Sequence, residues 1–263
     1  MSDRKSRQVL RRAKGHNKEA ILVATGCYVQ VAKENLEEIE EIDIILGNNE
    51  KKDIVRYVED FDKKRKEKVT DISKKQEYLE FGMTVYTEKT RAVIKVQDGC
   101  DNFCSYCIIP FARGRIRSRK LENVISEIKE IVRRGIKEVV LTGIQIAHYG
   151  RDLDGDIRLI DLLEEINKIE GLERIRIGSL EPRLLTEEFI DRLKKLEKMC
   201  HHFHLSLQSG CTETLKRMNR KYTREDILEL AKRLRENFED AILTADIIVG
   251  FPRRNRRRIF CNL

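Results

Sequence analysis

Residues 96–119 read VQDGCDNFCSYCIIPFARGRIRSR, and this stretch decides both the fold and the chemistry expected of the chain. Its three cysteines, Cys100, Cys104 and Cys107, have the spacing C-x3-C-x2-C, whereas the other cysteines of the chain are scattered singly. Three thiolates in one loop can bind three irons of a [4Fe–4S] cube and leave the fourth iron without a protein ligand. Such an open iron can chelate S-adenosylmethionine (SAM), which an electron from the cluster then cleaves to a 5′-deoxyadenosyl radical.

A structural zinc site is the alternative for the same three cysteines. Structural zinc takes four protein ligands, usually in paired C-x2-C units. A fourth ligand could come from Cys27, Cys200 or the His201-His202 pair, but the sequence has no second cysteine pair. The spacing is the signature of radical SAM enzymes, so it favours the cluster and leaves zinc as the rival.

From residue 92 onward, the chain alternates predicted strands and helices. Apolar runs predict strands at 92–96, 138–142, 174–178, 203–207 and 242–249, the last at an uncovered edge of the barrel, and helices are predicted at 121–134, 158–169, 186–198 and 223–237. This alternation predicts right-handed βαβ units and a parallel sheet. The fold class expected is α/β, with a partial parallel (β/α) barrel over 91–252. Polar or glycine-rich segments follow all five strands, and the C-terminal ends of parallel strands are where ligands bind.

The residues before this barrel predict a smaller α/β unit. Helices are expected at 4–14, 31–40 and 50–60, and strands at 21–25 and 42–46. We therefore divide the chain into an α/β remnant (1–60), a charged linker (61–90), the incomplete barrel (91–252) and a separate tail (253–263).

Composition limits the setting and the partners of the protein. No stretch approaches the roughly 18 apolar residues of a membrane span, and the N-terminus is polar and basic, unlike a secretory signal. We expect a cytoplasmic protein that does not enter a membrane. The net charge of +8 suggests a nucleic-acid partner, but five of these charges come from the arginines of residues 253–263.

Several motifs resemble those of the methylthiotransferases, radical SAM enzymes that insert sulfur and then methylate it. Besides 96–119, they are DRKSRQ (3–8), SRKLENV (118–124), RIGSLEP (176–182), LSLQSGCTETLKRMNRKYT (205–223) and ADIIVGFP (245–252). The motif LTGIQIAHYG (141–150) is similar to the subgroup that acts on threonylcarbamoyladenosine in tRNA. The subgroups that act on isopentenyladenosine in tRNA, or on a ribosomal-protein aspartate, typically have Leu-Gly-Gln-Asn or a Gln-Asp variant there.

The resemblance implies roles for individual residues at the strand ends. Cys100, Cys104 and Cys107 would ligate the SAM-binding cluster. Tyr106 would pack against adenine, and Gly143 would pair with the methionine amino group. The remaining expected contacts lie after the last three strands, at Ser179, Glu181, Gln208, Ser209, Val249 and Gly250. Each of these non-cysteine residues also has a structural interpretation, as a turn former, a strand-end hydrogen bonder or core.

The basic residues beside the cysteine loop are a candidate RNA contact. Arg113, Arg115, Arg117 and Arg119 alternate along the chain, and arginine pairs well with phosphate oxygens. A solvated loop is the alternative interpretation. The same two interpretations apply to the basic residues of 4–14, and His148 is expected to be structural.

The sequence departs from the family at both ends. Methylthiotransferases carry a second, auxiliary cluster bound by three N-terminal cysteines, of which only Cys27 has a counterpart here. From VGFP, relatives continue with Gly-Glu-Thr-Glu-Glu, whereas this chain reads RRNRRRIFCNL. One base inserted into purine-rich codons for Gly-Glu-Thr-Glu-Glu-Asp gives Arg-Arg-Asn-Arg-Arg-Arg, so we hypothesise a frameshift. We expect a polypeptide truncated at both ends and, by itself, inactive in methylthiolation.

The function implied by the resemblance is methylthiolation of tRNA with two molecules of SAM. The target would be C2 of N6-threonylcarbamoyladenosine next to the anticodon, with tRNA and a reducing electron-donor protein as partners and a monomeric enzyme. Two alternatives stay open: a methylthiotransferase acting on N6-isopentenyladenosine, and a metal-bound RNA-binding module without catalysis.

Overall fold

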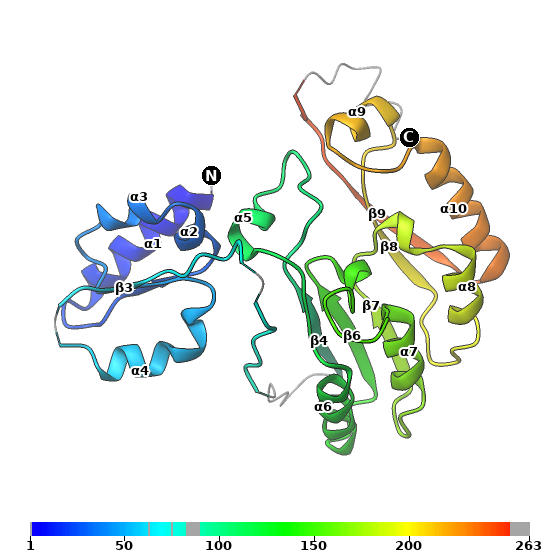
Figure 1. Ribbon diagram of the computed structural model, residues 1–263, viewed down its shortest axis with the longest axis horizontal. Coiled ribbons are helices and arrows are strands. Elements are labelled where there is room, and N and C mark those ends of the chain that lie inside the picture. The colour runs from blue at the N-terminus through cyan, green and yellow to red at the C-terminus, as the bar shows by residue number, and fades with distance from the viewer. Residues whose placement is uncertain (1, 63, 75, 83–89, 253–263) are drawn as a thin grey trace. The chain divides into compact units, whose positions relative to one another are not determined.

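The computed structural model describes residues 2–62, 64–74, 76–82 and 90–252 (Figure 1). The expected tail at 253–263, with its hypothesised frameshift, lies outside these residues. The chain divides into two compact units. The first comprises residues 1–81 with 108–115, and the second comprises 82–107 with 116–263.

The first unit is a three-stranded parallel sheet with short helices. Its elements are α1 (Ser2–His16), β1 (Val23–Thr25), α2 (Cys27–Val31), α3 (Lys33–Glu37), β2 (Ile44–Leu46), a 3-10 turn (Glu50–Asp53), α4 (Ile54–Glu59), β3 (Lys66–Lys68) and α5 (Ile109–Arg113). The strand order is β1-β2-β3, with Ile44 paired to both Val23 and Lys66. A small core forms where Val29, Leu36 and Ile45 are almost fully buried.

Two features of this unit differ from the sequence expectation. The helix expected at 31–40 is two helices, because Ala32 leaves the helical region (φ −145°) and ends α2. The charged run at 61–90, expected to be a linker, contributes strand β3. Its backbone pairs with the buried β2, and the Arg65 guanidinium donates hydrogen bonds to carbonyl oxygens of Leu36 and Glu37 at 2.8 Å. An edge strand of this kind needs backbone partners rather than an apolar face.

The second unit is a curled parallel half-barrel with helices outside it (Figure 1), which confirms the predicted fold class. Its strands are β4 (Arg91–Asp98), β5 (Arg117–Ser118), β6 (Glu138–Gly143), β7 (Arg174–Ile177), β8 (His202–Gln208) and β9 (Ile242–Ile247). Its helices are α6 (Leu121–Arg133), α7 (Leu159–Asn167), α8 (Glu187–Leu193), α9 (Thr212–Arg217) and α10 (Arg224–Asn237).

Strand pairing runs in chain order across the half-barrel. The strands β4, β6 and β7 are parallel neighbours, and the short β5 adds to β4 antiparallel. A separate pair, β8 and β9, is connected to β7 through isolated bridges such as Leu180 to Leu205. The five parallel strands therefore carry their C-terminal ends, and the loops that follow, to one rim.

The core of this unit follows from side-chain periodicity. Every second residue of β4 from Ala92 to Val96 is buried, and Val124 and Ile128 of α6, four residues apart, are fully buried in the same cluster. A period of two on the strand and of nearly four on the helix gives each element one apolar face. Helix α10 begins at a capping box of Thr223 and Asp226. No helix in the described part of the chain is long and apolar enough to cross a membrane.

Candidate active site

The cysteine loop leaves the C-terminal end of β4 through a turn that needs glycine. Gly99 has φ +74°, a conformation that residues with a Cβ adopt only at a cost, and its amide donates to the Asp98 carboxylate at 2.8 Å. Phe103 also has a positive φ, +46°. This strained residue is held by Asn219, whose side-chain amide donates to the Phe103 carbonyl at 3.0 Å. The loop is thus a defined structure rather than a loose connection.

The segment after α9 anchors the loop from more than 110 residues away in sequence. The Ser105 hydroxyl donates to the Arg217 carbonyl at 2.8 Å, and the Ser105 amide donates to the Met218 carbonyl at 3.2 Å. Asn219, in the left-handed region at φ +59°, supplies the bond to Phe103. The loop conformation is therefore set by residues that follow β8.

All three cysteines of the loop are half-buried with free thiols. The Asn102 amide donates to Cys100 Sγ at 3.4 Å, and burial raises the pKa of the Cys100 thiol to about 11. The Cys107 amide donates to the Cys104 carbonyl at 2.9 Å. A raised thiol pKa favours the protonated form, so a bound cation is needed to hold Cys100 as the thiolate.

Arg220 contacts the loop at Cys104, a residue that sequence reasoning missed. Its Nη1 lies 3.5 Å from Cys104 Sγ, its Nη2 donates to the Ser206 carbonyl at 2.7 Å, and its guanidinium lies 5.0 Å from the Tyr222 ring centre. Among the described residues, no carboxylate forms an ion pair with this half-buried cation. An uncompensated cation beside a cysteine favours negative charge there. Arg220 lies within the quoted motif LSLQSGCTETLKRMNRKYT, but no local sequence pattern indicates that its side chain contacts Cys104.

Polar side chains connect the ends of β4, β6 and β7. Gln97 accepts from the Gln145 amide at 2.7 Å, and Gln145 donates through Nε2 to Glu181 Oε2 at 2.7 Å. Asn102 of the cysteine loop donates to the same oxygen at 3.2 Å. A Cβ added to Gly143 would lie 3.0 Å from Gln97 Cβ, so glycine allows the ends of β4 and β6 to approach closely. Glu181 is therefore brought to the cysteine loop.

The other expected contacts lie along the same rim. Tyr106 is 38% exposed, and partial burial is the main cause that raises its pKa. Ser179 follows β7. Gln208 ends β8 at φ +64°, and its carbonyl accepts from the Ile248 amide at 2.9 Å, next to Val249 and Gly250. The Val249 side chain is 71% exposed, so its apolar surface faces solvent here.

The expected arginine track is wrong for two of its four members. Arg117 and Arg119 are buried, with 4% and 8% exposure. Arg117 lies 3.4 Å from Asp98, and Arg119 forms an ion pair with Glu127. Arg117 belongs to β5, which pairs with β4 opposite Asp98, and Arg119 follows β5. Both guanidiniums therefore have acidic partners within the protein.

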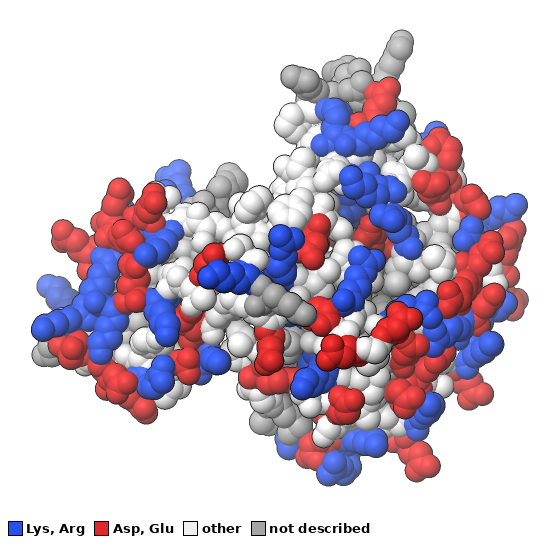
Figure 2. Space-filling model, viewed as in Figure 1, with Lys and Arg blue, Asp and Glu red and all other residues white. Residues whose placement is uncertain are grey.

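For the other two members, the RNA contact stays a prediction. Arg113 is half-buried and Arg115 exposed, and both belong to the first unit. On the face shown in Figure 2, basic and acidic side chains are interspersed, which agrees with the small net charge of the chain outside its tail.

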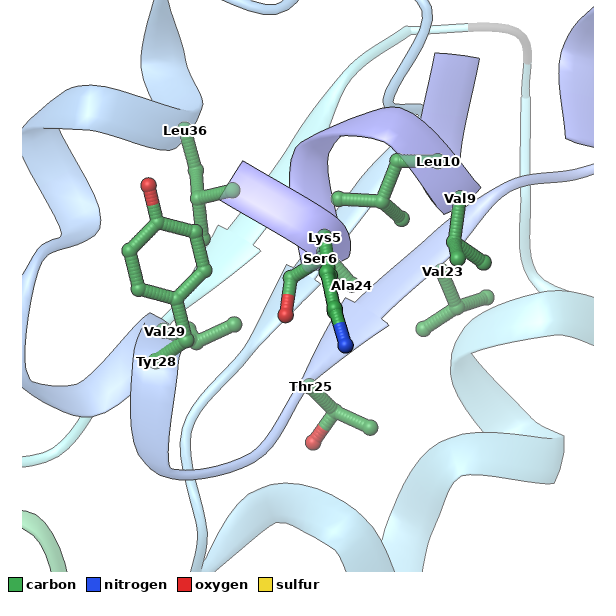
Figure 3. A pocket seen from close by; sticks show the side chains of 10 residues that line it. All are labelled: Lys5, Ser6, Val9, Leu10, Val23, Ala24, Thr25, Tyr28, Val29 and Leu36. Atoms are coloured by element: carbon green, nitrogen blue, oxygen red, sulfur yellow. The ribbon is translucent and has the colours of Figure 1, made fainter. Parts of the chain in front are cut away.

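Cys27 lies in the first unit as the opening residue of α2 and is half-buried. A cavity of about 400 Å³ adjoins its neighbours Thr25 and Tyr28. Figure 3 shows that α1, β1, α2 and α3 supply the lining, with apolar side chains such as Val9 and Leu10 and the ammonium of Lys5.

In the described ranges, no three His, Cys, Asp or Glu side chains form a group that could hold a single metal ion. The fit of the loop to an iron–sulfur cluster therefore rests on its donor set. Three thiols lie in one loop, and a cation without a carboxylate partner contacts one of them. Thiolate donors suit iron–sulfur clusters, and the residues present fit that group.

Comparison with known proteins agrees with this geometry. The family model described as "Radical SAM superfamily" matches residues 94–259. The chain is 41% identical over 252 residues to threonylcarbamoyladenosine tRNA methylthiotransferase MtaB of Aquifex aeolicus (strain VF5), covering 95% of this chain and 61% of that protein. It is 39% identical over 247 residues to tRNA-2-methylthio-N(6)-dimethylallyladenosine synthase of Clostridium novyi (strain NT), covering 92% and 54%.

Among solved structures, the cobalamin-dependent SAM radical enzyme OxsB with aqua-cobalamin and SAM bound aligns with a TM-score of 0.66. The sequence identity is 13%, and the alignment covers 98% of this chain and 41% of that one. This likeness concerns the fold. The chain spans 54% to 61% of the length of the curated relatives named above.

Proposed function

We propose, on the premise that the chain belongs to the radical SAM superfamily, that Cys100, Cys104 and Cys107 hold a [4Fe–4S] cluster with one iron open to SAM. The resemblance to methylthiotransferases expected from sequence is confirmed by the relatives. The observation that carries the proposal is the C-x3-C-x2-C loop, fixed at the C-terminal end of β4 and contacted by Arg220. When bound, the cluster supplies the electron that cleaves SAM.

The residues of the chain orient and shield this site. The hydroxyl and amide of Ser105 and the side-chain amide of Asn219 hold the loop backbone in one conformation, so the segment that carries the thiols is ordered in the absence of a ligand. Such pre-organisation reduces the ordering cost of binding. Gly143 and Ser179 would contact SAM from the rim, as would Gln208, Val249 and Gly250 from β8 and β9. Glu181, which the resemblance also places near SAM, holds Asn102 of the cysteine loop and would act on SAM through that loop. Tyr106 would cover the adenine.

For the full-length protein, we propose methylthiolation of tRNA at an N6-modified adenosine next to the anticodon. The relatives of both subgroups support tRNA as the substrate, and the proposal includes a cytoplasmic location for the enzyme. N6-threonylcarbamoyladenosine is the favoured target because of the LTGIQIAHYG motif. Cys27 would be one ligand of the auxiliary cluster, and a reducing protein would supply the electrons.

Anaerobic reconstitution of the chain with iron and sulfide tests the cluster. About four irons per chain and a broad absorption near ~400 nm are expected, with 5′-deoxyadenosine released on adding SAM and dithionite. Replacing any of the three loop cysteines by alanine should abolish both signals. Cys200→Ala, a half-buried cysteine near Arg176, is the matched control and should retain them. One colourless zinc per chain would instead support the RNA-binding alternative.

The isopentenyladenosine target is the second candidate, because a relative named for dimethylallyladenosine matches almost as well. Mass spectrometry of tRNA nucleosides from a deletion strain separates the two. We expect loss of the methylthiolated threonylcarbamoyl nucleoside. Loss of the methylthiolated isopentenyl nucleoside alone would assign the second substrate.

A further inference from the structure

A cavity of about 350 Å³ opens in the second unit beside the cysteine loop. Its walls come from the segments that follow β6 and β7 and from the start of α7. The polar lining residues that matter below are Asn102, His148, Arg151, Arg158, Glu181 and Arg183. His148 and Glu181 form a buried floor, with 5% and 6% exposure, whereas the three arginines are exposed. The cavity thus has a buried polar floor beneath a cationic rim.

The floor contains a nitrogen with no hydrogen-bond partner. His148 Nδ1 is buried and unsatisfied, and its Nε2 lies 3.8 Å from Glu181 Oε2. Burial lowers the pKa of His148 and the nearby Arg151 and Arg183 act in the same direction, against Glu181 and Asp101. The imidazole is therefore neutral near pH 7. A buried polar atom without a partner costs free energy, which a polar ligand would recover.

The charges of the rim are unevenly compensated. Arg158 lies 2.8 Å from Glu188, so its charge is paired. Within the described ranges, neither Arg151 nor Arg183 has an ion pair. Both lie close enough to influence His148, which places two guanidiniums over the same floor. Guanidinium groups in this setting match a carboxylate.

Glu181 supplies a hydrogen-bond acceptor at the floor of the cavity. Its Oε2 already accepts from Gln145 and Asn102, whereas no hydrogen bond is formed by Oε1 among the described residues. A ligand that fits would donate N–H groups to Glu181 on the floor and present a carboxylate to the arginines of the rim, Arg151 and Arg183. This order of groups is that of a ureido-linked amino acid.

We propose that this cavity binds the N6 substituent of the substrate adenosine and selects a ureido-linked carboxylate, with Arg151 and Arg183 as specificity-determining residues. The inference rests on the proposed tRNA function. An alkenyl substituent would desolvate His148, Glu181 and the two guanidiniums without replacing their hydrogen bonds. Sites built for polar groups reject such analogues strongly. The carboxylate of the SAM methionine has the same chemistry, so the experiment must separate the two sources.

The test uses the reconstituted chain and three probes: SAM, and anticodon stem-loops carrying either N6-threonylcarbamoyladenosine or N6-isopentenyladenosine. Affinities are measured by anaerobic equilibrium binding for the wild type and for Arg151→Gln, Arg183→Gln and the control Arg158→Gln. We expect the first two variants to weaken binding of the carboxylate stem-loop by about tenfold each, the scale of one charged hydrogen bond. Binding of SAM and of the isopentenyl stem-loop should stay unchanged, and Arg158→Gln should change each affinity less than about threefold.

Each other outcome overturns the inference. Equal wild-type affinity for the two stem-loops shows that the substituent is not selected here, and a loss confined to SAM assigns the cavity to the methionine carboxylate. Because the exchanged arginines are exposed, unchanged thermal melting verifies that the variants fold. The cluster is quantified first by iron content. Failure to form it contradicts the proposed function, whereas failure to discriminate stem-loops with the cluster intact contradicts only this inference.

Discussion

Replacing Arg220 tests whether its charge acts on the cysteine loop. The relevant geometry is the 3.5 Å contact between its Nη1 and Cys104 Sγ. At an effective dielectric constant of about 20, two unit charges at that distance interact by about 5 kcal/mol. The charge of a cluster is spread over several atoms, so its mean distance from the guanidinium is about twice as large. The interaction energy is then about 2 kcal/mol. For one electron this is a shift of about 100 mV.

The sign follows from the charge of the side chain. An added electron is stabilised by a nearby cation, so Arg220→Gln should lower the reduction potential of the reconstituted cluster by about 100 mV. The assay is a dye-mediated redox titration followed by electron paramagnetic resonance. Arg220→Lys keeps the positive charge, so its reduction potential should stay close to that of the wild type. Arg217→Gln is the matched control, because that guanidinium bonds the Pro252 carbonyl and Thr214 rather than a cysteine.

Two results would refute this reasoning. A shift below about 20 mV in Arg220→Gln, with iron content intact, would show that the charge is screened from the cluster. An equal shift in the lysine and glutamine variants would show that hydrogen-bond geometry matters instead. Arg220→Gln also loses the bond to the Ser206 carbonyl. We therefore expect its free energy of unfolding to fall by about 1–3 kcal/mol, which thermal melting measures separately.

Three further substitutions test the scaffold by thermal or urea unfolding. Gly150 has φ +91°, and a Cβ added there would lie 1.8 Å from the Ile157 carbonyl oxygen, so we expect Gly150→Ala to destabilise the protein by more than about 3 kcal/mol. Gly155 has a similar φ of +79° but open space around it, so Gly155→Ala is the control and should cost only about 1–2 kcal/mol. The pKa of Glu138 is held low by the two guanidiniums of β7, which outweigh burial. Glu138→Gln should therefore cost about 2 kcal/mol at pH 7, a difference that shrinks as pH falls below the usual glutamate pKa of 4.5, whereas the exposed Glu173→Gln is the control and should leave the unfolding midpoint unchanged. Arg117→Ala removes one member of a buried ion pair and should destabilise by about 3 kcal/mol.

Apolar runs between helical patterns predicted the barrel strands well, because each strand is a short apolar segment that alternates with an amphipathic helix. The strand expected at 138–142 is Glu138–Gly143, and the helix expected at 223–237 is Arg224–Asn237. The cysteine loop was equally predictable, because all three donors lie within one short stretch. Strand β3 was missed since its charged residues carry no apolar signal, and its stability comes from pairing with β2.

The errors at the site have a different physical origin. Whether an arginine faces phosphate or the protein interior depends on acids elsewhere in the chain, and Arg117 finds Asp98 only because β5 folds back on β4. Arg220 reaches Cys104 from 116 residues away. Such contacts are properties of the folded topology, and no local pattern specifies them.

Glu181 connects the cysteine loop to the substituent cavity. Its Oε2 accepts from Asn102, which lies between Cys100 and Cys104, and from Gln145. The same carboxylate forms the floor of the cavity beside His148. Under the proposal, a ligand N–H binds Oε1 of the same carboxylate whose Oε2 accepts from Asn102, so occupancy of the cavity would be coupled to the conformation of the loop. Because such coupling is reciprocal, a loop ordered by its cluster should in turn hold Glu181 in the position that the substrate needs.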